Sequence, residues 1–290
     1  MKVVGFTIIR NALKFDYPIK EAILSIAPLC DEVIVLVGNS DDDTLNFIKQ
    51  IAPDKVKIHE SIWDDSLRKG GAVLALETQK AYELIAADAD WCFYIQGDEV
   101  VHEKDYAAIR SAMQLHKDNL SIDGLLFDFK NFYGSYEYVA DALNWVRKEV
   151  RIIRKNKAIY SYGDALGFRK NNNEKLAAKK IEAAIYHYGW VREPAAMQQK
   201  SESFHKMWHD DEWVAQNIVK ASEFDYNQID SLAPFVGTHP AVMQERIGRK
   251  TWHFAFDFSK KKTKVKYKIR EWLQQKFNIE IGGFRNWKEV

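Results

Sequence analysis

The N-terminal third of the chain alternates short apolar runs rich in β-branched side chains with stretches of helical periodicity. The predicted strands cover residues 3–9, 32–37, 55–59 and 91–95, and the predicted helices follow Pro18, Thr44 and Gly71. Strands and helices in this alternation form a mostly parallel sheet with both faces covered. Ligands of such sheets bind beyond the carboxyl ends of the strands. We therefore expect an α/β protein whose functional groups follow its strands.

The regular alternation of predicted strands and helices ends at about residue 120. Strands are expected at 125–129 and 150–153, with an aromatic loop at 132–138 between them. From Pro194 onward the pattern is mainly helical, without a low-complexity linker or an internal repeat. The expected division is an α/β domain over residues 1–190 and a mainly helical C-terminal extension over 191–290.

Composition narrows the class of protein. With 290 residues, 47% of them hydrophobic, the chain can bury one large core or two unequal ones. Lys and Arg number 42 against 41 Asp and Glu, so net charge gives no support for nucleic-acid binding. Neither an export signal nor an apolar run of transmembrane length is visible, which predicts a cytoplasmic location. Cys30 and Cys92 lie in apolar surroundings and are expected to be buried thiols without chemistry.

The strand at 91–95 leads directly into Gln96, Gly97, Asp98 and Glu99. Gly97 lets the backbone turn close to a ligand. Carboxylate oxygens suit Mg²⁺ or Mn²⁺ when a diphosphate supplies the remaining ligands. Alone, such a pair is more often an ordinary polar turn than a metal site, so its context decides.

That context resembles the family 2 glycosyltransferases of GT-A fold over roughly residues 3–105. The resemblance is carried by Arg10-Asn11 after the first strand, Gly38 to Thr44 after the second, the loop Trp63-Asp64-Asp65, and Gln96 to Glu99 after the fourth. In the family, one strand ends in an Asn-Glu-like pair, another in an Asp-Gly-Ser-x-Asp-x-Thr turn, and an Asp-x-Asp motif holds the metal. The resemblance implies a GT-A-like nucleotide-binding fold and a nucleotide-sugar donor. The donor-binding candidates are Arg10, Asn11, Asn39, Arg68, Gly71, Gln96 and Gly97.

This sequence departs from the family pattern at two places. Gln96 stands where the first Asp of the metal motif would be, so Asp98 matches the second, metal-contacting carboxylate. Val37 and Gly38 replace acidic residues that often precede the turn and read the nucleotide base. The identity of the base therefore does not follow from the sequence.

Arg68, Lys69, Gly70 and Gly71 lie immediately before a predicted helix. Free N–H groups at a helix start carry partial positive charge, and an arginine can bind a diphosphate with two hydrogen bonds. The alternative is a helix start with a solvated arginine.

Two further roles are implied by the resemblance. A downstream histidine can complete the metal site, and His187 is the candidate, with an imidazole hydrogen-bonded among aromatic rings as the alternative. Inverting members use a carboxylate to deprotonate the acceptor, and Asp164 is the candidate. Asp141 and Glu149 are its competitors, and a structural turn carboxylate remains open.

The aromatic residues of the second half could stack on sugar faces or pack in the core; they are Tyr133, Tyr136, Tyr138 and Trp145.

His205 and His209 are one helical turn apart, but Lys206 occupies the position where a metalloprotease has glutamate, so we discount a peptidase.

The sequence thus predicts a glycosyltransferase of the hexosyl or a related type. It would move a sugar from a nucleotide-sugar donor to a saccharide or lipid-linked acceptor, as in polysaccharide biosynthesis, by metal-assisted inverting displacement. The alternatives are an inactive nucleotide-sugar-binding module and a nucleotidyltransferase; the glycine-free stretch 8–13 argues against the latter. The basic amphipathic segment 260–277 predicts weak contact with an anionic membrane, at the inner surface, or packing of its apolar stripe on the protein.

Overall fold

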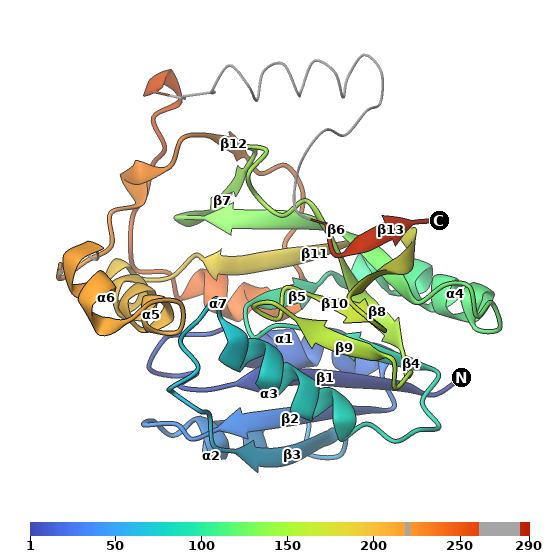
Figure 1. The fold of residues 1–290 in the computed structure, drawn as a ribbon. Helices are drawn as coiled ribbons and strands as arrows, with labels where there is room; N and C mark the ends of the chain where they lie inside the picture. Colours follow the sequence, from blue (N-terminus) through green and yellow to red (C-terminus); the bar gives the residue numbers. More distant parts are fainter. Residues whose placement is uncertain (218–220, 261–284) are drawn as a thin grey trace.

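A curled sheet runs through the protein, with helices on both of its faces (Figure 1). The structure is a computed structural model that describes residues 1–217, 221–260 and 285–290. The strands are β1 (Val3–Ile9), β2 (Glu32–Gly38), β3 (Val56–Ser61), β4 (Trp91–Tyr94), β5 (Glu99–Val101), β6 (Gly124–Tyr133), β7 (Ser135–Ala140), β8 (Lys148–Arg154), β9 (Ile159–Tyr162), β10 (Gly167–Lys170), β11 (Glu174–Trp190), β12 (Leu232–Pro234) and β13 (Trp287–Glu289). The α-helices are α1 (Ile19–Ile26), α2 (Thr44–Lys49), α3 (Ala72–Glu83), α4 (Tyr106–His116), α5 (Pro194–Lys206), α6 (Asp211–Asn217) and α7 (Gln244–Gly248). Short 3₁₀ helices are η1 (Ala27–Leu29), η2 (Glu103–Asp105), η3 (Tyr226–Gln228), η4 (Ala241–Met243) and η5 (Phe258–Lys260).

The N-terminal half of the sheet is parallel, as predicted. Its order is β3-β2-β1-β4, and β1 pairs with β2 on one side and with β4 on the other. The carboxyl ends of these strands therefore lie at the same edge. The α/β fold expected from the alternating pattern is confirmed.

Side chains of β1 alternate between two cores. Val3 and Ile9 pack with α1, α2 and α4, whereas Val4 and Phe6 pack with α3 on the other face. Burial on both faces explains why β1 reads as a continuous apolar run rather than an alternating one.

Beyond β4 the sheet is mixed. It continues as β8-β6-β11-β10-β9, with β4–β8 and β8–β6 antiparallel and β6–β11 parallel. The expectation of an aromatic loop at 132–138 was wrong: β6 extends to Tyr133 and turns at Gly134 into β7. Gly134 has φ +68°, a conformation that glycine adopts without the Cβ clash of other residues.

The longest strand, β11, was not predicted from the sequence. Its N-terminal part, Glu174 to Ala184, is rich in Ala, Lys and Glu, which are typical of helices. Pairing with β6, β10 and β13 overrides this local preference.

The helical C-terminal extension is not confirmed. The described residues beyond 190 form α5, α6, the short α7 and two strands joined by irregular chain. β12 pairs with β7, and β13 pairs with β11 in the main sheet. Apart from Lys260, the basic segment 260–277 lies outside the described residues. Among the described helices, none has the length and apolar character needed to cross a membrane.

Candidate functional site

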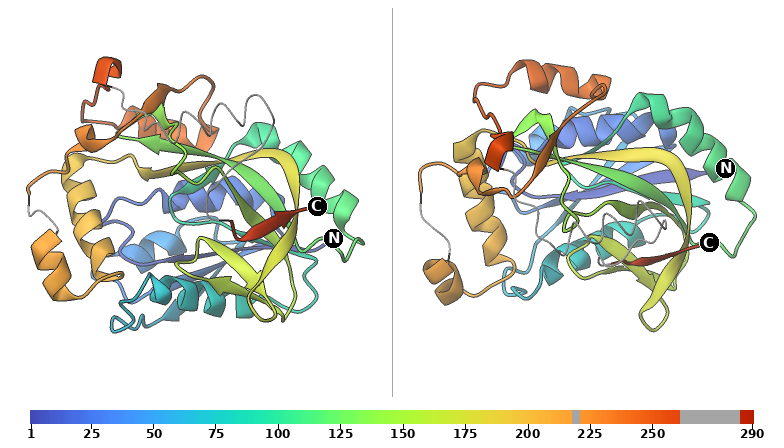
Figure 2. Two further views of the ribbon diagram at one scale, coloured as in Figure 1. Left: turned by 45° about the horizontal axis from the view of Figure 1, so that its top comes forward. Right: turned by 90° about the horizontal axis from the view of Figure 1, so that it is seen from above.

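A cavity of about 860 Å³ opens at the carboxyl edge of the parallel strands. Its walls come from the segments that follow β1 and β4, the loop 63–68, the turn 164–166, the end of β11 and the helix α5. α5 lies beyond the carboxyl ends of β1 and β2, as both views in Figure 2 show. The volume lies within the range of small-molecule sites.

Asn11 joins the loops that follow β1 and β2. It has φ +55°, its backbone N–H donates to Ser40 Oγ at 3.0 Å, and its side-chain oxygen accepts from the Asp41 N–H at 2.7 Å. Arg10 donates to the Asn39 carbonyl at 2.9 Å and forms a two-pronged ion pair with Asp65, the shorter distance being 2.5 Å. Arg10 and Asn11 line the cavity, as expected of donor-binding candidates, but they also hold its rim together.

Asn39 does not present its amide oxygen to the cavity, because that oxygen accepts from the Trp63 N–H at 3.0 Å. The indole of Trp63 lies against Gly38, where an added Cβ would come within 2.3 Å of its Nε1. Gly38 therefore allows close approach of an aromatic ring at a position where acidic residues often stand in the family. The Arg10 guanidinium lies 5.7 Å from the same ring centroid.

The loop before α3 is tied to the C-terminal helices. Arg68 donates to the Lys206 carbonyl and to Asp211, both at 2.7 Å, and the Gly71 N–H donates to the Met207 carbonyl at 3.3 Å. Hydrogen bonding to Asp211 raises the pKa of Arg68. The groups predicted to bind phosphate thus have partners within the protein.

Gln96 is hydrogen-bonded within the protein as well. Its amide nitrogen donates to the Ala165 carbonyl at 3.1 Å and to the Tyr94 hydroxyl at 3.4 Å. Gly97 leaves room for Ile9, whose Cδ1 would lie 3.0 Å from an added Cβ. Both residues line the cavity.

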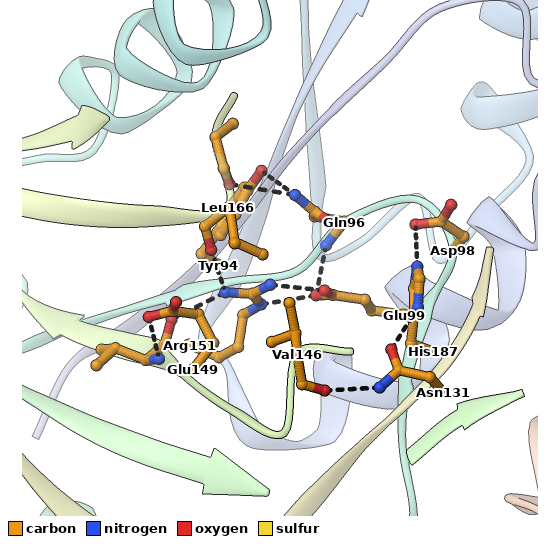
Figure 3. A network of polar contacts seen from close by, with 12 residues as sticks. Tyr94, Gln96, Asp98, Glu99, Asn131, Val146, Glu149, Arg151, Leu166 and His187 are labelled. Carbon is orange, nitrogen blue, oxygen red and sulfur yellow. Dashed lines mark hydrogen bonds and ion pairs between the residues drawn. The ribbon is translucent and has the colours of Figure 1, made fainter. Parts of the chain in front are cut away.

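Asp98 and Glu99 point to different partners (Figure 3). Glu99 accepts two hydrogen bonds from Arg151, at 2.7 and 2.8 Å, and both side chains are fully buried. Removing one partner of such a pair leaves a buried charge uncompensated, so Glu99 has a structural role here. Asp98 lines the cavity instead, and of the two carboxylates it is the one available to a ligand.

His187 lies beside Asp98 because β11 runs between β5 and β6. In the register of the sheet, His187 pairs with Glu99 on one side and with Asn131 on the other. Its Nδ1 lies 3.0 Å from the Asn131 side-chain oxygen, and its Nε2 lies 3.8 Å from Asp98 Oδ1. Since an amide oxygen only accepts, Nδ1 carries the proton and Nε2 presents a lone pair towards Asp98. Burial lowers the pKa of His187, which favours this neutral form.

Lys200 is the residue of this site that sequence reasoning missed. Its ammonium lies 3.0 Å from Asp98 Oδ2 and 2.8 Å from the Gly189 carbonyl. Burial alone would raise the pKa of Asp98, but the positive charges of Lys200 and Arg192 outweigh it and hold that pKa below its ordinary value. A signal existed: Lys200 follows the buried Met197 by three positions and so shares its helix face.

The corner formed by Asp98 and His187 fits a divalent ion in part. Gly189 has no side chain to collide with these two residues. A Cβ at this position would lie 2.4 Å from His187 Nε2 and 2.9 Å from Asp98 Oδ2. Two ligands bound to one ion at about 2.1 Å stand roughly 3 to 4 Å apart, which the separation of 3.8 Å matches. No cluster of three His, Cys, Asp or Glu side chains suited to a metal occurs within 1–217, 221–260 and 285–290. Further ligands would have to come from the bound molecule.

Asp164 is the candidate base that lines the cavity; its competitors Asp141 and Glu149 do not. Burial raises the pKa of Asp164, and its carboxylate accepts a hydrogen bond from the Leu166 N–H at 3.3 Å. It packs against Gly71, where an added Cβ would lie 2.8 Å from Asp164 Cβ. Glu149 is buried beside Asn286, away from the cavity.

The aromatic candidates pack mainly in the core. Tyr133 and Tyr136 are 4% and 3% exposed, Trp145 contacts Tyr133, and Tyr138 contacts Phe254. The rings that line the cavity belong to Phe15, Tyr17, Trp63, Tyr94, Trp190 and Phe204.

The remaining sequence candidates are placed as follows. Cys30 and Cys92 are buried, as predicted, and burial raises the pKa of Cys92 to about 12. His205 stacks near His209, which stacks on Trp213 at 3.5 Å. Both histidines contact the ring of Trp213, in agreement with the prediction that they do not form a zinc peptidase site.

No family model matches the chain, and the curated proteins include no match. Among solved structures, it is similar to TarS 1–349 from S. aureus, with a TM-score of 0.38 and 12% identity, over 77% of this chain and 67% of that one. It spans 39% of a longer TarS chain.

Two further solved structures are similar over shorter segments. One is glucosyl-3-phosphoglycerate synthase from Mycobacterium tuberculosis, in complex with Mn²⁺, uridine diphosphate and phosphoglyceric acid, with a TM-score of 0.30 and 20% identity over 46% of this chain and 43% of that one. The other is 4-diphosphocytidyl-2C-methyl-D-erythritolsynthase from Anaerococcus prevotii DSM 20548, with a TM-score of 0.32 and 9% identity over 53% of this chain and 70% of that one. All three similarities extend over part of this chain and are at low sequence identity.

Proposed function

We propose that the protein transfers a sugar from a nucleotide-sugar donor to an acceptor hydroxyl. The observation that carries this proposal is the meeting of Asp98 and His187, from distant parts of the sequence, inside a cavity of about 860 Å³ at the carboxyl edge of a parallel sheet. Ligands of open α/β sheets bind at this edge, and the cavity has room for a nucleotide sugar. The GT-A resemblance of residues 3–105 supports the same donor class.

The diphosphate of the donor belongs at the corner of Asp98 and His187. These two residues would hold Mg²⁺ or Mn²⁺, and the ion, when bound, supplies positive charge to the departing diphosphate. Asn131 fixes the His187 ring in the tautomer that presents Nε2. The other donor-binding candidates, Arg10, Asn11, Asn39, Arg68, Gly71, Gln96 and Gly97, shape the cavity wall through the hydrogen bonds described above.

Asp164 is the proposed general base. The acceptor oxygen bonds to the anomeric carbon as the bond from that carbon to the diphosphate oxygen breaks, and the electron pair leaves with the diphosphate. The acceptor proton passes to the Asp164 carboxylate, whose raised pKa suits proton acceptance. A single displacement of this kind inverts the configuration of the anomeric carbon.

The test is a panel of nucleotide sugars, with release of nucleoside diphosphate measured in Mn²⁺ and in EDTA. The proposal expects one donor to be turned over, slowly to water or faster to an added saccharide acceptor. Binding of a donor without any turnover would instead favour the inactive binding module, which the substitution of Gln96 for an acidic residue supports. Failure of every nucleotide sugar to bind would reject both functions.

A further inference from the structure

The corner of Asp98 carries more positive charge than that carboxylate neutralises. Lys200 donates to Asp98 Oδ2, and its side chain, 13% exposed, reaches the cavity from α5. The fully buried Arg192 donates to the carbonyls of Phe15 and Gly189, and its charge also acts on Asp98. Both cations lie over the ring of Tyr17, at 4.9 Å each. Two cations thus share one carboxylate in a poorly solvated place, which favours the arrival of an anion.

The carboxylate of Asp98 divides its two oxygens between different partners. Oδ2 faces Lys200 at 3.0 Å, and Oδ1 faces His187 Nε2 at 3.8 Å. A cation held by Oδ1 and His187 would therefore lie close to the ammonium, and like charges at that range repel. A diphosphate between them would relieve the repulsion, because its oxygens can contact both.

We propose that Lys200 is a diphosphate-binding residue, which donates to Asp98 when no diphosphate is bound and to the phosphate oxygens of the ligand when one is. This inference rests on the proposed function and deepens it, because it assigns the leaving group a ligand on α5. Lys200 opposes metal binding in the absence of nucleotide and joins the metal in holding the diphosphate when nucleotide is present.

Inorganic pyrophosphate is the probe, because it tests the diphosphate site without the base or the sugar. Calorimetry in EDTA compares the wild type with Lys200→Met and with Lys49→Met, the same substitution at the exposed last residue of α2, which does not line the cavity. We expect Lys200→Met to weaken pyrophosphate binding roughly ten-fold or more and Lys49→Met to leave it unchanged. Titration with Mn²⁺ alone should show tighter binding to Lys200→Met than to the wild type.

Two more variants separate ligand binding from a purely structural ion pair. Asp98→Asn frees the ammonium and should bind pyrophosphate more tightly than the wild type in EDTA. The double variant Asp98→Asn/Lys200→Met removes both charges of the ion pair, so neither is left unpaired and folding is protected. It should bind pyrophosphate as weakly as Lys200→Met does. Equal pyrophosphate affinity in the wild type and Lys200→Met, or in Asp98→Asn and the double variant, would overturn the proposal. Pyrophosphate binding that depends on Lys200, with no nucleotide sugar bound, would reject the proposed function and retain the diphosphate site.

Discussion

At the scale of single residues, two adjacent carboxylates have opposite roles. Glu99 is enclosed with Arg151, whereas Asp98 reaches the cavity and keeps Oδ1 near His187. We expect Asp98→Asn to lower metal-dependent release of nucleoside diphosphate by roughly 10² or more, because the ion loses its carboxylate. The melting temperature should fall only modestly, because Lys200 loses its charged partner but still donates to the Gly189 carbonyl. Asp88→Asn, at an exposed surface pair with Lys2, is the control. Equal losses of activity and stability in Asp98→Asn would assign Asp98 to the structure alone.

Asp164 is expected to act on the acceptor and not on the donor. Asp164→Asn should lower transfer by roughly 10² to 10⁴ while donor affinity stays close to that of the wild type. Initial rates with a saccharide acceptor and donor titration by calorimetry measure the two effects separately. Retained transfer in this variant, together with loss in Asp141→Asn, would move the base to Asp141.

At the scale of elements, β8 brings charged side chains into the core. Arg151 binds Glu99 across to β5, and Glu149 accepts from Asn286 near the chain end. Burial raises the pKa of Glu149 to about 7, although Arg151 and Arg169 oppose the shift. A raised pKa in the folded state means that the protonated acid stabilises the fold, and that this stability is lost as pH rises from about 4.5 through 7.

Glu149→Gln should remove that pH dependence, since the amide resembles the protonated acid. We expect the variant to gain stability relative to the wild type between pH 5 and pH 8, by on the order of 2 to 3 kcal/mol. Urea unfolding at the two pH values gives the difference directly. A difference between the two proteins that does not vary with pH would show that Glu149 keeps an ordinary pKa.

The elements also show where sequence reasoning succeeds. The four parallel strands were predicted because β-branched, apolar runs in a sheet covered on both faces leave a strong local signal. The N-terminal part of β11, Glu174 to Ala184, has no local strand signal. It forms a strand because it pairs with β6, β10 and β13. Asp98 and His187, which line the cavity, were candidates from the motifs and the family resemblance. Lys200 was missed because its contact with Asp98 depends on how α5 docks, which the local pattern does not fix.

At the scale of the whole molecule, the membrane contact proposed for 260–277 needs a different test from truncation. Removing everything after residue 259 would also remove β13, which belongs to the main sheet. Replacing Lys261, Lys262, Lys264 and Lys266 by Gln changes the charge and leaves β13 in place. Flotation with anionic vesicles should then fall, most clearly at low salt, relative to the wild type. Equal recovery with anionic and neutral vesicles would remove support for a peripheral membrane location.

The chain end is expected to hold the molecule together. β13 pairs in parallel with the N-terminal part of β11, and Trp287, 4% exposed, packs in the core that includes Phe6, Tyr94 and Phe168. Replacing a buried aromatic residue by alanine removes its burial and leaves a cavity, so Trp287→Ala should lower the free energy of unfolding by about 3 to 5 kcal/mol. Lys288→Ala, at the next and exposed position of β13, should cost much less. Urea unfolding of both variants at one pH compares them. Equal, small effects would mean that the last strand adds nothing to the core, and that the sheet is complete at β11 without it.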